Sequence, residues 1–537
     1  MRPGSASLAL LLVALVALVG CSRATNVATG DRAQVLHRSI GPDLADLDPH
    51  LATQTSSYSV LSSLLEGLVA EDPRDLGPVP GVAERWEASP DGLRYTFHLR
   101  ADARWSNGDP VKSEDFIGSW KRVLTPSLAA TNAGQLYVIQ GAEAYNKGDS
   151  DFSQVGLRAP DNHTLSVTLE HPAPWFLSLL SSPVWLPVHL PTVQKNGGVA
   201  ARENAWAVPG KWVGNGPFDL VSWHRGQEII VRRSPTYWDR AHVRLSEIHF
   251  HAFDSIDAEE RAFRAGQIHL TEALPPDRIE TYRRESPELL RTDPLLGTYF
   301  LRINVRRPGL SDARIRQALS LAVDRSSIVE RLLHGGQKPA LSFIPPGLAG
   351  YAPALPDRRT LEDARNLLAE AGHPGGKGLP VFDFLYNTSE THRTVAEALQ
   401  EMWRRDLGVQ IRLVNQDVKV KEDSRSSGAF ELLQSSWIAD YADPCAFLEI
   451  WRTGSGNNFT GWSNADFDGD LFSALRTADP AARGALYAKA ERLLLAEAPI
   501  IPLYHYTHVF LIRPSVHGWN PTLLDHHPYK GVWLGEP

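Results

Sequence analysis

Residues 437–444, WIADYADP, combine groups that bind cations with groups that bury apolar surface. The segment holds two carboxylates, Asp440 and Asp443, after Trp437, and it ends at Pro444. A buried carboxylate without a cationic partner is unfavourable, so acids are rare in core strands. The segment is therefore either a solvated turn or a site whose cation comes from elsewhere. Asp443, which directly precedes a proline, is predicted to be a turn residue.

Motifs for several catalytic and metal-binding chemistries are missing. Residues 372–378, GHPGGKG, resemble a phosphate loop, but the glycines are spaced one position short and Gly378 stands where a Ser or Thr would bind magnesium. No Gly-x-Ser-x-Gly or Ser-x-x-Lys motif marks a serine nucleophile. The histidine pairs lack the spacing and the cysteines of structural zinc sites: His249/His251, His505/His508 and His526/His527. We expect no enzyme, metal or cofactor, although His249 and His251 share one strand face.

The amino terminus has the pattern of an export signal. Arg2 precedes an apolar run over residues 8–19, which is too short for a membrane span but typical of a signal sequence. The run ends in Leu-Val-Gly-Cys at Cys21, which resembles the bacterial lipobox. We therefore predict a signal peptide over residues 1–20 and lipidation of Cys21. The alternative is ordinary cleavage at small residues beside a chance cysteine. Acyl chains on Cys21 would hold an exported protein at a bacterial membrane, inner or outer.

Composition limits the remaining possibilities. Of the two cysteines only Cys445 would remain for pairing, so no internal disulfide is expected. The formal net charge of −8 does not favour nucleic acid as a partner. The length of 537 residues suggests about three domains. We expect a monomer stabilised by packing.

Helical and strand patterns alternate along the chain, which favours layered α/β domains. Residues 93–99 alternate as a strand, and Ser113 is placed to cap a helix over residues 116–124. One helix is predicted over residues 314–336, with a glycine pair as its stop. Further helices are predicted next to two strands: helices 361–372 and 394–408, strands 381–388 and 409–416.

Several blocks of the sequence resemble the peptide-binding solute receptors of ABC importers. They follow the order of that family through nearly the whole chain: SLLEGLV (63–69), residues 80–126, GNGPF (214–218), RSPTYWD (233–239), residues 310–329, residues 384–416 and WIADYADP (437–444). The resemblance implies an α/β, two-lobed periplasmic binding protein fold with an additional inserted domain and mixed sheets. It also implies the domain ranges, with boundaries good to several residues: 24–65, 190–293 and 508–537 for lobe I, 66–189 for the inserted domain II, and 294–507 for lobe III.

The family resemblance implies a partner for Asp440 in WIADYADP. In such receptors the aspartate at the position of Asp440 pairs with the α-ammonium of a peptide, so the ligand supplies the missing cation. The alternative is that Asp440 is a turn or cap residue. The resemblance further implies an extended oligopeptide ligand, closure of the two lobes over it, and delivery to an ABC permease and its ATPase.

A receptor for many peptide sequences should hold the backbone by strand addition. By position, the main-chain partners are Ser436 and Ile438 on one side and Thr53 and Thr55 on the other. The rings of Trp437 and Tyr506 match family residues that wall side-chain pockets, although each could be simple core.

The chain departs from the family where the ligand carboxylate binds. Gln434 replaces an arginine of some receptors, and Leu333 falls on a lysine position. Arg425 and His392 match positions that receive a carboxylate, unless they have only a surface role. Because murein-peptide receptors use a similar arginine, cell-wall peptides are the second candidate ligand. An oligosaccharide receptor and an exported hydrolase are less favoured alternatives.

Overall fold

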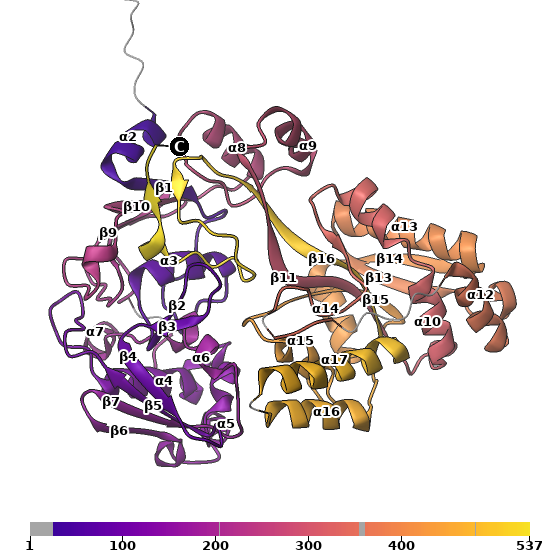
Figure 1. Ribbon diagram of the computed structural model, residues 1–537, viewed down its shortest axis with the longest axis horizontal. Coiled ribbons are helices and arrows are strands. Elements are labelled where there is room, and N and C mark those ends of the chain that lie inside the picture. The colour runs from indigo at the N-terminus through magenta and orange to yellow at the C-terminus, as the bar shows by residue number, and fades with distance from the viewer. Residues whose placement is uncertain (1–24, 203–204, 349, 354–359, 478, 537) are drawn as a thin grey trace, which may run out of the picture.

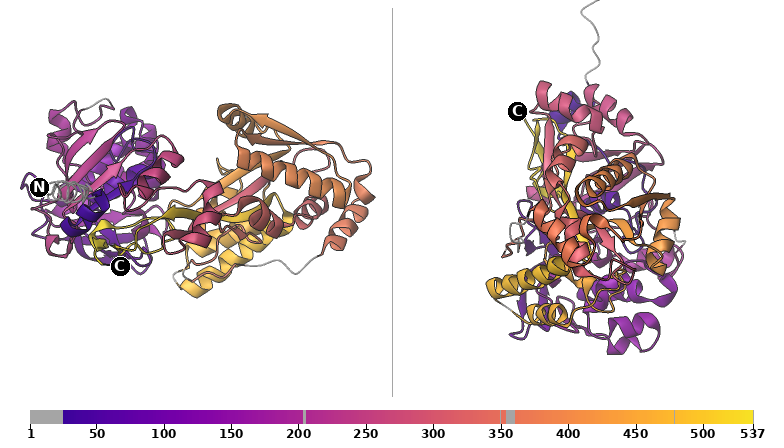
Figure 2. Two further views of the ribbon diagram at one scale, coloured as in Figure 1. Left: turned by 90° about the horizontal axis from the view of Figure 1, so that it is seen from above. Right: turned by 90° about the vertical axis from the view of Figure 1, so that its right-hand side faces the viewer.

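The computed structural model describes residues 25–202, 205–348, 350–353, 360–477 and 479–536. The predicted signal peptide and Cys21 lie outside the described residues. The chain forms two lobes (Figure 1), and the view from above shows that a few connecting segments join them (Figure 2). Within the described ranges, no helix has both the length and the apolar character needed to cross a membrane.

A mixed sheet organises the first lobe. Its strand order is β1-β10-β9-β8: β1 (Val35–Ser39) is parallel to β10 (Glu247–His251), whereas β9 (Glu228–Arg233) is antiparallel to β10 and to β8 (Phe218–His224). Alternation places apolar side chains in the core: Leu36, Ile229, Val231, Ile248 and Phe250. The other face of β1 and β10 therefore carries His37, His249 and His251.

A second sheet in this lobe comes from the chain between β1 and β8. Its antiparallel order is β4-β5-β7-β6: β4 (Ala83–Ala88), β5 (Arg94–Leu99), β7 (Thr164–Thr168) and β6 (Leu157–Asp161). The strand predicted over 93–99 is confirmed by β5. Against the sheet packs α4 (Ser113–Leu124), which buries Phe116 and Trp120. The predicted cap is wrong, because Ser113 donates to the Asp161 carbonyl and Asp115 instead accepts the Lys112 N–H at 2.8 Å.

Short elements complete the first lobe. The helices are α2 (Asn26–Ala33), α3 (Thr55–Leu64), α5 (Ala142–Lys147), α6 (Phe176–Leu179), α7 (Leu190–Lys195), α8 (Ile256–Arg264) and α9 (Pro276–Glu285). Two strand pairs lie beside them: β2 (Val69–Glu71) with β3 (Pro78–Pro80), and β17 (Val516–His517) with β18 (Trp533–Leu534). The three predicted domain ranges stay predictions.

The second lobe is built on a sheet of order β12-β16-β11-β15-β13-β14. The longest strands, β11 (Leu290–Ile303) and β16 (Ile500–Leu511), are antiparallel and run from the first lobe into the second (Figure 1). Their register shifts between Pro294 and Thr298, where the proline cannot donate to the ladder. The other strands are β12 (Lys338–Pro339), β13 (Phe382–Asn387), β14 (Ile411–Gln416) and β15 (Leu432–Ile438).

Helices surround this second sheet (Figure 1): α10 (Ala313–Leu321), α12 (Leu361–Glu370), α13 (Glu390–Leu407), α14 (Val418–Ser427), α15 (Cys445–Leu448), α16 (Ala465–Leu475) and α17 (Pro480–Glu497). The prediction of one helix over 314–336 is wrong. Asp324 caps a new helix, α11 (Arg325–Ser327), by accepting the Ser327 N–H at 3.0 Å, and a π-helical turn follows to Leu333. The turn ends at His334, with φ 55°, before the glycine pair.

Candidate functional site

One edge of β15 is open beside the middle of the molecule. β15 pairs with β11 along its whole length, from Leu432 to Ile438. On its other side β13 reaches only Leu432 and Leu433. In the described part of the chain, no strand pairs with that side of residues 434–438. Because a strand edge presents unpaired N–H and C=O groups, this edge is a template for another extended chain.

The alternation of hydrogen-bonded pairs along β15 shows which residues direct their backbone N–H and C=O groups to the open edge. The Ala439 N–H donates to the Leu296 carbonyl at 2.9 Å, so Ala439 belongs to a hydrogen-bonded pair with β11. In an antiparallel ladder such pairs alternate, so Ser436 and Ile438 direct their N–H and C=O groups away from β11. No described residue donates to or accepts from these backbone groups on the open side. This geometry agrees with the two residues predicted for strand addition.

Tyrosine rings lie beside the open edge. Ser436 pairs with Tyr299 across the ladder, and Tyr299 stacks on Tyr504 with ring centroids 4.7 Å apart. Tyr506 lies edge-on to Tyr504 at 5.5 Å, and burial raises the pKa of Tyr506 to about 12 despite its hydrogen bonds to Ser436 and Tyr504. Ile438 leaves 53% of its surface exposed. The face around Ser436 and Ile438 is therefore apolar, aromatic and accessible.

Trp437 points to the opposite face of β15 from Ser436 and Ile438. Its indole packs partly against the large hydrophobic core, and Nε1 donates to the Ala446 carbonyl at 2.7 Å. That bond ties β15 to the segment that carries the two aspartates. Trp437 thus positions the loop, and its predicted role as a pocket wall stays a prediction.

The two carboxylates of WIADYADP differ in their surroundings. Asp443 is buried, accepts the Cys445 N–H at 2.9 Å and pairs with Arg483 at 3.2 Å, so its predicted turn role is confirmed. Asp440 follows the open edge of β15 directly, and its side chain has neither a hydrogen bond nor an ion pair with any described residue. Surrounding protein raises the pKa of Asp440 above its usual value because no cation compensates for desolvation.

A lysine that the sequence reasoning missed lies at the other end of the open edge. Lys421 on α14 is buried, and its Nζ donates to Gln434 Oε1 and Asn387 Oδ1 at 2.8 Å each. Nζ also lies 3.4 Å from the Gln434 carbonyl, which the alternation directs to the open side. Burial lowers the pKa of Lys421, and Arg425 and Arg302 lower it further against an opposing effect of Glu422.

A positive group therefore faces Gln434 at this end of the open edge. Lys421 and Arg425 are four residues apart on α14, so they share a helix face. This spacing was the signal in the sequence that could have identified Lys421.

The remaining residues predicted to receive a carboxylate lie near this end. Arg425 pairs with Glu422 at 2.5 Å and lies over the Phe459 ring at 4.8 Å. His392 Nδ1 lies 3.2 Å from the Tyr299 hydroxyl, and burial, with help from Lys421, lowers its pKa. Leu333 packs partly against the core of the second lobe. The two matching residues, Arg425 and His392, are only partly buried.

The residues predicted for the other side of the ligand lie in the first lobe. Thr53 is exposed and precedes α3, and Gln54 between the two threonines has an extended backbone, with φ −87° and ψ 136°. Thr55 is the first residue of α3, and its side chain lies outside the described part of the structure. The backbone contact of these two threonines with a ligand stays a prediction.

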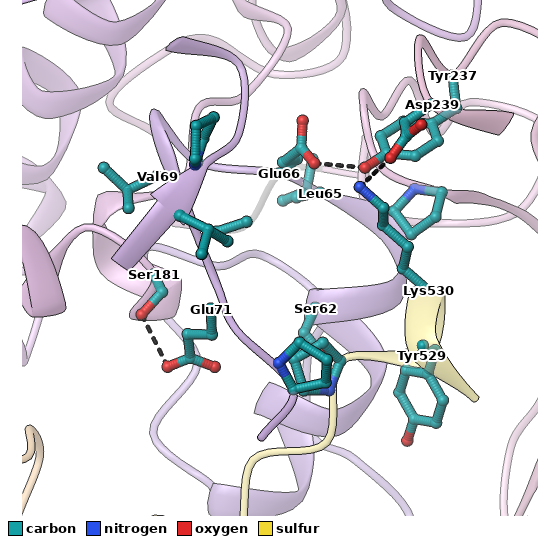
Figure 3. Close-up of a pocket in the computed structure, with 18 of the residues that line it drawn as sticks. Ser62, Leu65, Glu66, Val69, Glu71, Ser181, Tyr237, Asp239, Tyr529 and Lys530 are labelled. Atoms are coloured by element: carbon teal, nitrogen blue, oxygen red, sulfur yellow. Dashed lines mark hydrogen bonds and ion pairs between the residues drawn. The ribbon is translucent and has the colours of Figure 1, made fainter. Parts of the chain in front are cut away.

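A cavity of about 500 Å³ in the first lobe is a competing candidate (Figure 3). Its acidic groups already have protein partners: Glu71 accepts from Tyr58 at 2.6 Å and Ser181 at 2.9 Å, Glu66 accepts from Tyr237, and Asp239 pairs with Lys530. The β15 edge, in contrast, offers backbone groups and a carboxylate that no described residue satisfies. The β15 edge is therefore the stronger candidate for the functional site.

Known proteins share this architecture. The family model described as bacterial extracellular solute-binding proteins, family 5 Middle, matches residues 77–459. The periplasmic oligopeptide-binding protein OppA of Escherichia coli K12 is 35% identical over 496 residues, covering 91% of this chain and 90% of OppA. The structure of the periplasmic murein tripeptide-binding protein MppA in its unliganded open form has a TM-score of 0.83 and 33% identity, covering 93% of this chain and 97% of MppA. The Haemophilus influenzae OppA complex with RPPGFSPFR has a TM-score of 0.75 and 30% identity, covering 94% and 99%.

Two lobes joined by long strands, in an arrangement shared with solved periplasmic peptide-binding proteins, define a periplasmic binding protein. The chain belongs to the bacterial extracellular solute-binding proteins of family 5. The family resemblance and the α/β, two-lobed fold with mixed sheets are thereby confirmed.

Proposed function

We propose that this protein captures extended oligopeptides with a free amino terminus and delivers them to the permease and ATPase of an ABC importer. The observation that carries the proposal is the open edge at Ser436 and Ile438, which ends beside the unpaired carboxylate of Asp440. In this proposal the protein is exported to the periplasm and anchored by a lipid on Cys21. The relatives that bind peptides support this function.

Backbone pairing explains how one site accepts many sequences. Every peptide offers the same N–H and C=O groups, so pairing with Ser436 and Ile438 does not depend on the ligand's side chains. The exposed surface of Ile438 and the ring of Tyr506 leave room for varied side chains beside the edge. On the first lobe, Thr53 and Thr55 would supply the second set of main-chain contacts when the lobes close.

The charges at the two ends of the edge set the direction of the ligand. A peptide whose ammonium meets Asp440 and whose backbone pairs with Ser436 and Ile438 runs antiparallel to β15, toward Gln434. Lys421 lies at that end, where its contact with the Gln434 carbonyl blocks further pairing. The edge is thus negative where the peptide begins and positive where it continues, which matches the polarity of a free peptide.

Lys421 also orients the Gln434 amide. A lysine only donates, so the bond to Oε1 directs the Gln434 amide N–H groups away from Lys421. Those donors and the charge of Lys421 would receive the carboxylate of a short ligand in place of the missing arginine. Arg425 and His392 would meet the carboxylate of a longer ligand or an acidic side chain.

Closure of the lobes completes the site. The similarity to the unliganded open form of MppA supports an open arrangement for this structure. The ligand would shift an equilibrium between open and closed forms because only the closed form contacts it from both lobes. Desolvation on closure makes the ammonium of the ligand a requirement, since removing one partner of a buried ion pair costs about 2–5 kcal/mol.

Cell-wall peptides are the second candidate ligand. Lys421 and Arg425 place two cations on one face of α14, and murein peptides carry additional carboxylates that such cations would bind. The similarity to a murein tripeptide-binding protein supports this alternative.

Calorimetric titration tests the proposed function. Alanine oligopeptides should bind at one site per chain, and their N-acetylated forms at least tenfold more weakly, about 1.4 kcal/mol. A murein tripeptide that outcompetes all alanine peptides would favour the second candidate. Equal affinity for free and acetylated peptides, or cleavage of the peptide during the titration, would refute the proposal.

A further inference from the structure

Three histidines converge on the polar face of the first sheet, away from the β15 edge. His37 lies on β1, and His249 is its direct partner on the parallel neighbour β10 (Figure 1). His251 lies two residues further along β10, on the same face. One ring nitrogen from each histidine lies within 4.8 Å of the others, and His37 Nδ1 is 3.0 Å from His251 Nε2.

We propose that His37, His249 and His251 bind a divalent transition-metal ion of the zinc, nickel or copper type. Three imidazoles form a ligand set that these ions share, whereas magnesium and calcium prefer oxygen ligands. Metal–nitrogen distances of about 2.0–2.1 Å require the three ring nitrogens, which now lie within 4.8 Å of one another, to move closer together around the ion. The proposal departs from the expectation of no metal site, which rested on motifs within single segments.

Carboxylates lie behind the histidine rings, as in many metal sites. Glu228 Oε2 is 3.7 Å from His251 Nδ1, the nitrogen opposite the one that faces His37. On His249, the hydrogen bond of Nε2 to Glu247 at 3.1 Å leaves Nδ1 as the ligand nitrogen, and the same Glu228 oxygen is 3.6 Å from that Nδ1. A carboxylate on the second ring nitrogen fixes the tautomer and the orientation of a ligating histidine. The cluster therefore has both ligands and the groups that orient them.

A fourth histidine holds the ring of His37 in place. His269 stacks on His37, and its Nδ1 accepts the His37 N–H at 3.0 Å, so it supports the site without being a ligand.

The alternative is a polar cluster without metal, in which His37 and His251 share one proton. The two interpretations differ in what a metal ion does to the protein. If the site binds metal, the ion joins β1 to β10 and stabilises only the folded state. A proton-sharing cluster has no affinity that depends on all three rings.

Zinc titration of the full chain, purified without a histidine tag and treated with EDTA, tests the proposal. We expect one Zn²⁺ per chain and a higher melting temperature with zinc. The variants His37→Gln and His249→Gln should each bind zinc at least tenfold more weakly. His224→Gln is the matched control, because His224 is an exposed histidine on β8 of the same sheet, and it should bind as the unmodified protein does.

A measurement on the unmodified protein tests the proposal even if the variants fold poorly. Co²⁺ bound by three imidazoles should give visible absorption stronger than that of the aqueous ion, and zinc should displace it. Absence of this absorption, or zinc binding that both glutamine variants retain, would overturn the proposal.

Discussion

The Lys421 ammonium donates to Oε1 of Gln434 at 2.8 Å, so a cation from helix α14 lies at the Gln434 end of the open β15 edge. Lys421 is 7% exposed, and its described hydrogen-bond partners are neutral oxygens. Its positive charge is thus not neutralised by a direct ion pair. A ligand carboxylate near Gln434 would complete the charge balance of this end of the site.

Replacing this lysine should affect the carboxyl end of the ligand only. For Lys421→Met we expect roughly tenfold weaker binding of short peptides with a free carboxylate, about 1.4 kcal/mol, and a smaller change for their C-terminal amides. Lys419→Met is the control, because Lys419 is exposed on the same helix. Calorimetry with matched free and C-terminally amidated peptides measures the affinity of each variant for the two ligand types. An equal loss for the two ligand types would contradict this role of Lys421.

The alternation along β15 predicts that proline at one of two neighbouring serines weakens peptide binding, whereas proline at the other lowers the stability of the fold. Ser436→Pro removes an N–H on the open side, so peptide binding should fall at least tenfold, about 1.4 kcal/mol, with little change in stability. Ser435→Pro removes an N–H from the ladder with β11 and leaves the opposing carbonyl without its donor, so it should destabilise the fold by about 1–3 kcal/mol. Urea denaturation and calorimetry separate the two effects. If both variants lose the same stability, the open edge is not where the register places it.

Asp440 should discriminate between free and blocked amino termini. Asp440→Asn is expected to weaken free peptides tenfold or more, at least about 1.4 kcal/mol, while N-acetylated peptides change little. Asp443→Asn is the control, because Asp443 already pairs with Arg483. This variant should leave the ratio of the affinities for free and N-acetylated peptides unchanged. Intrinsic tryptophan fluorescence offers an independent signal of lobe closure. Equal losses for free and acetylated peptides would reject the ammonium contact.

Local patterns in the sequence predicted much of the fold but less of the site. The strand over 93–99 and the turn role of Asp443 followed from alternation and from the proline after it, which act within a few residues. Ser113 was misassigned because its hydroxyl bonds to Asp161, a contact between distant segments. Lys421 and the approach of His37 to His249 and His251 were missed for the same reason, since helix and strand packing brings these residues together.

The raised pKa of Asp440 predicts that this carboxylate lowers the stability of the unliganded protein. Between the pKa of an unfolded aspartate, about 3.9, and the higher value in the folded state, the unfolded chain holds fewer protons. The free energy of unfolding should therefore fall as the pH rises through this interval, and the loss persists at neutral pH. Asp440→Asn removes the charge, so the variant should be more stable than the unmodified protein at pH 7. The difference should shrink as the pH falls through the same interval and be lost below about 3.9. Urea denaturation of both ligand-free proteins, from pH 7 to below about 3.9, measures this difference in the free energy of unfolding. If Asp440→Asn is instead less stable at pH 7, the carboxylate of Asp440 has a stabilising partner in the unliganded protein, and this prediction is wrong.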